Sequence, residues 1–318
     1  MKAILASAVV ALMPTAVMAE EAKTTADGFV SIAAGYSGQQ DGDYSYQNTY
    51  SSGTGTNDGK VDGPDFELRA TGAVPIRGAL GAQLDGVFSR TYYKVSDCGG
   101  CSTYHSDDST VAAHIFVRNP DKGLLGVVVQ RSTTNVGGSR GQSTFLIGGE
   151  GKLYMGRVSF GGQMAYGVVD GNNSYDNNGP FAAMKLRYFP SDNFMLEVRG
   201  EHAQLKQKPG SNSGYDCPDY CYTVKNTMWD LGGKAEYRLS NSGFSLFAEA
   251  DYRNLDNRSN YVDFLSYFSN NQRKSTNLRA MVGLKVSFGS KSLFERDRSG
   301  AGLDPVRPFN ASAFSFEE

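Results

Sequence analysis

The sequence predicts an all-β protein, a single closed antiparallel up-and-down transmembrane β-barrel of twelve strands. From Gly28 onward, apolar and polar residues alternate in twelve segments of strand length, and no segment of useful length has the period of a helix. The connections between these segments alternate strictly between short turns and long polar loops. Short turns on one side and long loops on the other are typical of barrels that span an outer membrane.

Each element follows from this alternation. The predicted strands cover residues 28–38, 64–74, 80–93, 110–118, 124–132, 143–153, 157–168, 180–189, 194–205, 227–238, 244–254 and 276–288. The short connections have the Gly, Pro, Asn and Asp content of hairpin turns and cover residues 75–78, 119–123, 154–156, 190–193 and 239–243. The long connections are rich in Asn, Ser, Tyr, Gly and Asp and cover residues 39–63, 94–109, 133–142, 170–179, 206–226 and 255–275.

The first nineteen residues have the features of a secretory signal peptide. Lys2 precedes an apolar run over residues 3–17, and Val17-Met18-Ala19 places small residues at the positions that a signal peptidase requires. We therefore expect cleavage after Ala19, a barrel over residues 20–288 and a tail over residues 289–318. No later segment has eighteen consecutive apolar residues, which excludes a helical membrane span. The formal charge of -2 gives no basic field for nucleic acid.

The two faces of each strand indicate which solvent the barrel meets. In residues 194–201, Phe194, Leu196 and Val198 share one face, and Glu197 and Arg199 share the other. The outer surface of a membrane barrel is apolar and its interior is polar. A soluble sandwich or a lipocalin-like barrel is the alternative, and it would pack the apolar face inward.

The aromatic residues of the apolar faces sort by position along the strands. Two belts of aromatic rings are expected where a barrel crosses the two membrane interfaces. The belt on the long-loop side comprises Tyr36, Phe66, Tyr92, Phe145, Tyr166, Trp229 and Tyr252. The belt on the short-turn side comprises Tyr188, Phe194, Tyr237, Phe244 and Phe288.

The last predicted strand, residues 276–288, has to pair with the first, because an open sheet edge in hydrocarbon leaves backbone groups unpaired. Gly283, Val286 and Phe288 in this strand resemble the targeting pattern in the last strand of Gram-negative outer-membrane β-barrels, the porin-like class with twelve strands. Met281 stands where that pattern usually has a polar residue. The resemblance implies a place in the bacterial outer membrane, contact with its lipid and lipopolysaccharide, and recognition by the barrel-assembly machinery through Gly283, Val286 and Phe288.

The chain continues for thirty residues beyond the predicted closing strand, on the periplasmic side. This tail has Gly, Pro and charge but no repeat, and the simplest interpretation is a disordered appendage. Alternatively, it folds into the barrel mouth or binds a periplasmic partner, with Phe294, Phe309, Phe314 and Phe316 as anchors.

The inward positions carry acids and bases in nearly equal numbers. Twelve tilted strands give a backbone diameter of roughly 24 Å, which leaves room for small solutes at best. Either the charged walls form a polar channel for passive diffusion of small hydrophilic solutes, which we favour, or dense ion pairs fill a non-conducting barrel that binds a partner through its loops or tail. The predicted pore-lining residues are Asp65, Glu67, Arg69, Asp85, His114, Arg118, Lys185, Arg187, Glu197, Arg199, Glu201, Asp230, Lys234, Glu236, Arg238, Glu249, Asp251, Arg253, Arg279 and Lys285.

Few residues indicate chemistry beyond transport. The three histidines, His105, His114 and His202, have no evident Ser or acid partners at catalytic spacing, so we expect no enzyme activity, no cofactor and no metal site. The aromatic loop 260–268 packs on its own loops, constricts the lumen or contacts a second copy of the chain. Two local disulfides are expected in the exported protein, and they join Cys98 to Cys101 and Cys217 to Cys221.

Overall fold

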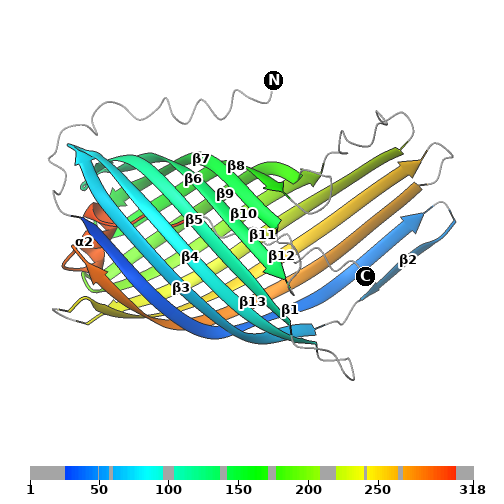
Figure 1. Cartoon of the computed structure of the whole chain (residues 1–318), viewed down its shortest axis with the longest axis horizontal. Helices are drawn as coiled ribbons and strands as arrows, with labels where there is room; N and C mark the ends of the chain where they lie inside the picture. Colours follow the sequence, from blue (N-terminus) through cyan, green and yellow to red (C-terminus); the bar gives the residue numbers. More distant parts are fainter. Residues whose placement is uncertain are drawn as a thin grey trace.

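A closed ring of twelve antiparallel strands forms the body of the protein in the computed structural model (Figure 1). The structure describes residues 26–48, 50–56, 60–95, 104–136, 142–170, 177–207, 220–239, 242–263 and 268–305. The ring comprises β1 (Asp27–Asn48), β3 (Lys60–Arg77), β4 (Leu80–Val95), β5 (Tyr104–Asn119), β6 (Gly123–Val136), β7 (Gln142–Met155), β8 (Val158–Asp170), β9 (Asn177–Ser191), β10 (Phe194–Gln207), β11 (Tyr220–Arg238), β12 (Phe244–Asp263) and β13 (Phe268–Phe288). β13 pairs with β1, with Phe288 opposite Gly28, and this pairing closes the ring. The predicted fold class is confirmed.

The strands are longer than the apolar alternation predicts, and they grow on the long-loop side. β1 continues to Asn48 and β12 to Asp263, so parts of two predicted loops are strand. Residues 260–263 and 268 of the predicted aromatic loop pair across β12 and β13, and residues 264–267 lie outside the described part of the chain. The short strand β2 (Ser52–Thr56), which was not predicted, pairs with the outer part of β1. Since β2 has no apolar face, the alternation of apolar and polar residues could not predict its pairing with β1.

The polarity of the barrel is inverted, as the sequence predicted. Apolar side chains of the strands point outward, and Leu231, Met184 and Val282 each keep 61–65% of their surface exposed. Charged side chains point inward and are buried, and Glu236 and Asp85 each keep 1% of their surface exposed. The soluble sandwich is therefore excluded. No helix in the described ranges is long and apolar enough to cross a membrane.

The outward orientation of the aromatic belts is also confirmed. The twelve assigned rings are exposed, except that Phe194 is half-buried. In the closing strand, Val286 and Phe288 face outward, and Gly283 lies against the ring of the inward Phe247. Met281 is buried with Ala33 and Phe247 on the inner wall. The apolar Met281 in place of a polar residue therefore fills an inner-wall contact.

The tail does not extend away from the barrel. Directly after β13, Gly289 adopts a φ of 89°, a backbone conformation that favours glycine. The short helix α2 (Leu293–Ser299) follows, and it lies at the short-turn end of the ring, drawn in red-orange in Figure 1. Residues 300–305 continue from α2 into the lumen. We call residues 290–305 the plug segment.

Candidate functional site

The helix of the plug segment has a local sequence signal at its start. The Oγ of Ser292 accepts a hydrogen bond from the Glu295 backbone N–H at 3.0 Å, and Glu295 Oε2 accepts one from the Lys291 N–H at 2.6 Å. The Ser-x-x-Glu sequence at residues 292–295 is that of a capping box, although Glu295 binds the N–H one residue before the cap residue Ser292. A helix of seven residues is too short to be stable alone, so its stability comes from packing. The capping box was the signal in the sequence that could have predicted this helix.

Apolar side chains anchor the plug segment to the inner wall. Leu293 is 1% exposed and packs with Phe189 and Met195, and the Phe294 ring meets Phe189 edge-on at a centroid distance of 5.4 Å. Leu303 packs against the wall with Phe116 and Leu124. Burying a side chain of this size contributes roughly 1.5–3 kcal/mol. Phe294 is therefore an anchor, as one of our two interpretations of the tail proposed.

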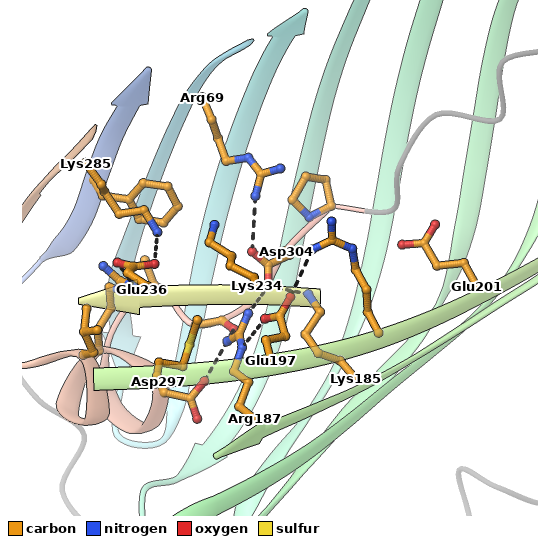
Figure 2. A pocket seen from close by; sticks show the side chains of 18 residues that line it. Arg69, Lys185, Arg187, Glu197, Glu201, Lys234, Glu236, Lys285, Asp297 and Asp304 are labelled. Carbon is orange, nitrogen blue, oxygen red and sulfur yellow. Dashed lines mark hydrogen bonds and ion pairs between the residues drawn. The ribbon is translucent and has the colours of Figure 1, made fainter. Parts of the chain in front are cut away.

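Two carboxylates of the plug segment bind a group of cations on the wall, shown in Figure 2. Asp297 Oδ1 accepts hydrogen bonds from Lys152 Nζ at 2.5 Å and from Arg187 Nη1 at 2.7 Å. Asp304 Oδ2 accepts one from Lys185 Nζ at 2.6 Å and a second from Arg187 Nη2. Arg69 Nη1 lies 3.5 Å from Asp304 Oδ1. We call Arg69, Lys152, Lys185 and Arg187, which come from β3, β7 and β9, the basic cluster.

A reciprocal contact joins a cation of the plug segment to an acid on the wall. Arg296 Nη2 donates to Glu236 Oε1 at 2.8 Å, and Lys285 Nζ donates to the other oxygen of Glu236 at 2.6 Å. Arg296 also donates to the Ser287 Oγ and lies 5.3 Å from the centroid of the Phe29 ring. The plug segment therefore pairs its acids Asp297 and Asp304 with cations of the wall, and its cation Arg296 with the wall acid Glu236.

Backbone atoms of the plug segment are bound as well. Arg118 Nη1 donates to the Gly300 carbonyl at 2.6 Å, and Lys152 Nζ donates to the Gly302 carbonyl at 2.9 Å. Gln83 Nε2 donates to the Leu303 carbonyl at 2.9 Å. Wall side chains therefore satisfy backbone groups that would otherwise be buried without partners.

The first strand also holds the plug segment. Asp27 Oδ1 accepts a hydrogen bond from the Ala301 N–H at 2.9 Å, and Asp27 Oδ2 accepts one from the Ser290 Oγ. A Cβ on Gly300 would lie 2.4 Å from the Asp27 carboxyl carbon. A side chain at position 300 would therefore displace this contact.

The plug segment occupies the short-turn end of the lumen. The cavity that remains beside the basic cluster has a volume of about 40 Å³, which is room for a few water molecules. For residues 290–305, the expectation of a disordered appendage is therefore wrong, because apolar anchors and ion pairs compensate the cost of ordering them. Phe309, Phe314 and Phe316 lie outside the described residues, and a periplasmic partner of the tail stays a prediction.

All twenty residues that we predicted to line the pore are buried or half-buried on the inner wall. The plug segment contacts Arg69, Arg118, Lys185, Arg187 and Glu236 directly. Many of the others form ion pairs with one another along the wall. These pairs include Arg279 with Asp65 and Glu67, Arg253 with Asp230, Arg199 with Asp251, Glu197 and Glu249, and Lys234 with Glu249. Arg238 donates to the Ser242 carbonyl at 2.8 Å, and Glu201 lines the cavity beside the plug segment.

The histidines take three different positions. His114 lies fully buried in the lumen, with Nδ1 2.9 Å from Glu150 Oε1 and Nε2 3.0 Å from Asp85 Oδ2. His202 stacks on Trp229 in the outer belt at a centroid distance of 4.0 Å. His105 lies 3.8 Å from Asp107. The absence of enzyme activity stays a prediction.

Sequence reasoning missed an apolar part of the inner wall. Towards the long-loop side of the charged residues, seven inward side chains from β7 to β12 form a buried cluster. Register joins them across neighbouring strands, because Phe181 is opposite Ala203 and Ala203 is opposite Met228. We predicted only the charged inward positions. Five of these apolar residues lie inside predicted strands, and Val169 and Leu255 lie just beyond the predicted strand ends. The cluster comprises Leu146, Val169, Phe181, Ala203, Leu205, Met228 and Leu255.

The predicted disulfides remain predictions. Cys98, Cys101 and Cys217 lie outside the described residues. Cys221, which we placed in a loop, lies in β11 with its backbone paired to Val262.

The plug segment is expected to stay docked under mildly acidic conditions. Burial alone would raise the pKa of Asp297, but Lys152 and Arg187 outweigh burial and hold the pKa of this carboxyl well below its usual value of 3.8. In the same way, Lys185, Arg187 and Arg69 lower the pKa of the buried Asp304 carboxyl. A lowered pKa stabilises the docked state above the ordinary pKa, and this stabilisation is lost only as the pH falls through the lowered value.

Hydrogen exchange of residues 293–304, corrected for the intrinsic exchange rate, measures this pH dependence. We expect protection to be constant from about pH 7 to about pH 4.5, because both carboxyls stay ionised over that range. A loss of protection between these two values would contradict the expectation.

Among the comparisons with known proteins, one solved structure, with a TM-score of 0.50, supports the fold. No family model matches the chain, and no curated protein matches it. A solved outer membrane channel from Pseudomonas putida F1 is 14% identical with a TM-score of 0.50, and the match covers 87% of this chain and all of that one. A FadL homologue of Pseudomonas aeruginosa is 10% identical with a TM-score of 0.42, and the match covers 87% of this chain and 94% of that one. The autotransporter translocator domain of NalP from Neisseria meningitidis is 13% identical with a TM-score of 0.44, and the match covers 89% of this chain and 92% of that one.

The closed ring, the apolar outer surface and the charged interior together meet the requirements for crossing a membrane with strands. The chain is a twelve-stranded β-barrel protein of the bacterial outer membrane.

Proposed function

We propose that the protein is an outer-membrane channel for the passive diffusion of small hydrophilic solutes, and that its plug segment closes the periplasmic end at rest. The observation that carries this proposal is the separateness of the plug segment. It adds no strand to the ring, and side-chain contacts provide most of its attachment to the wall. It can therefore leave without breaking the pairing that closes the barrel.

The composition of the inner wall supports passage of polar solutes. Charged side chains of both signs line the lumen, and backbone strands pair with one another and leave the interior to side chains. With the plug segment removed, a twelve-stranded ring of roughly 24 Å backbone diameter retains a narrow polar path between these side chains.

A second candidate function is a non-conducting barrel that binds a partner. The dense ion pairs of the wall favour it, because Arg279 bridges to Asp65 and Glu67 and Arg199 bridges to Asp251 across the interior face. Such pairs make the barrel rigid and narrow the path whether or not the plug segment is present.

Conductance in a planar lipid bilayer tests the proposal. We expect the full chain to be silent or to open rarely, and we expect regular conductance steps after deletion of residues 291–318. The full-length double variant Asp297→Asn, Asp304→Asn is expected to open often, because the basic cluster no longer attracts the plug segment. Folding of each variant is checked by heat-modifiable electrophoretic mobility. If the folded deletion variant stays silent, the channel is excluded and the second candidate stands.

A further inference from the structure

The basic cluster gathers more positive charge than the wall around it balances. Arg187 pairs with Glu197 of the neighbouring strand at 2.7 Å, and Arg69 lies 3.4 Å from Glu67. In the described part of the chain, the ion pairs of Lys152 and Lys185 are both with the plug segment, through Asp297 and Asp304. Departure of the plug segment would therefore remove the carboxylates that both lysines contact and leave Glu197 of the wall to attract Lys185. Unpaired charge on a buried wall is costly.

The two carboxylates are bound in a way that a single small molecule could reproduce. Arg187 bridges them, since Nη1 donates to Asp297 and Nη2 donates to Asp304. Lys152 donates to Asp297 at one end. Lys185 donates to Asp304 at the other end, and Figure 2 shows Arg187 between Asp297 and Asp304. A guanidinium fork with a lysine on each side is suited to two acidic groups held a short distance apart.

The surroundings of the basic cluster favour a solute over a macromolecule. The cluster lies inside the lumen, and the cavity beside it is lined by Arg199, Lys234 and Pro305 among others. Only a molecule that enters the barrel reaches it. In this low-dielectric interior, a charge-assisted hydrogen bond is about twice as strong as a neutral one.

We propose that the basic cluster is a binding site for small dianionic solutes, and that Asp297 and Asp304 occupy it as a built-in competitor. A dianion that enters the lumen takes the place of the two carboxylates and releases the plug segment. This inference rests on the proposed channel function and adds to it a substrate class and a means of opening.

Calorimetric titration of the detergent-solubilised full chain with succinate tests the competition. We expect the double variant Asp297→Asn, Asp304→Asn to bind succinate about ten-fold more tightly than the natural chain, because its plug segment no longer competes. Adding Lys185→Gln to the double variant should weaken binding about ten-fold or more. Adding Arg77→Gln, which removes an exposed cation outside the cluster, should leave binding unchanged.

Three ligand controls separate recognition from screening. Acetate and sodium chloride at matched ionic strength should bind at least about ten-fold more weakly than succinate. If inorganic phosphate binds as tightly as succinate, two negative charges are sufficient for binding. If phosphate binds more weakly, the site recognises two carboxylates that are held apart. Both results support a dianion site.

Other outcomes overturn the inference. Equal succinate affinity in the natural chain and the double variant would show that the carboxylates do not compete. If acetate or chloride binds as tightly as succinate, the basic cluster attracts any anion and is not a specific dianion site. A deletion variant that stays silent in the bilayer while succinate still binds would end the channel proposal alone, and conduction without succinate binding would end this inference alone.

Discussion

Asp297→Ala is expected to release the plug segment from the lumen. The substitution leaves Lys152 and Arg187 buried without the carboxylate that both now contact. Breaking a buried ion pair by removing one partner costs about 3–5 kcal/mol. The docking equilibrium should therefore shift by about two to three and a half powers of ten towards the released state, since each 1.4 kcal/mol is about ten-fold.

Limited proteolysis with trypsin measures this release through cleavage after Arg298. The Arg298 side chain contacts the short turns of the barrel, with Nη1 3.3 Å from the Pro120 carbonyl, so the docked state protects this bond. Cleavage of a transiently opened segment follows the population of the open state when closing is fast. The cleavage rate after Arg298 should be divided by the cleavage rate of a free peptide of residues 290–305 that carries the same substitution. This ratio removes any effect of the substitution on cleavage by trypsin itself.

The matched control for Asp297→Ala is Lys291→Ala, which removes an exposed charge at the start of the same segment. Its cleavage rate after Arg298 should equal that of the natural chain. If Asp297→Ala is as resistant as Lys291→Ala, the ion pairs of Asp297 do not hold the plug segment.

Val198→Arg is expected to destabilise the barrel by about 2–4 kcal/mol, the cost of an arginine on the lipid face near the bilayer midplane. Val198 faces outward with 56% of its surface exposed. It lies four residues from Phe194 in one aromatic belt and four residues from His202, which stacks on Trp229 in the other belt. This position between the belts places it at the greatest depth in the hydrocarbon.

Reversible unfolding by guanidinium in lipid vesicles measures the loss of stability. The control is Leu239→Arg, which is also outward-facing but lies at the short-turn end beyond Tyr237. There the cost should fall to about 0–1 kcal/mol, because the charge reaches the interface. Equal costs at the two positions would contradict the assignment of the outer surface to lipid.

The ring could be predicted because the alternation of apolar and polar residues indicates both where a strand lies and which of its side chains face outward. In β10, Val198 and Glu197 occupy opposite faces, and the structure exposes one to lipid and buries the other. The upper parts of β12 and β13 could not be predicted in this way. Their residues lie beyond the regular apolar alternation of the band, and their strands continue through backbone pairing, which includes Tyr261 opposite Ser269.

The docking of the tail could not be predicted from its own composition. Gly, Pro and charge in residues 289–318 are typical of a disordered segment. The compensating interactions lie far away in the sequence, since Lys152 is 145 residues from Asp297 and Arg69 comes from a different side of the ring. The inward orientation of each wall residue was predictable, but the identity of its partner depends on which residues the closed ring brings together.

The hydrogen bonds of Asp27 have a mechanical consequence for the whole cylinder. A barrel built from one chain has a seam where its two terminal strands meet, and here that seam joins β1 to β13. The carboxylate of Asp27, at the start of β1, accepts from Ser290 and Ala301, which both follow β13. The plug segment therefore links the two strands of the seam from inside the lumen. If it is released as we propose, the seam loses these two hydrogen bonds, and its lateral stability should fall.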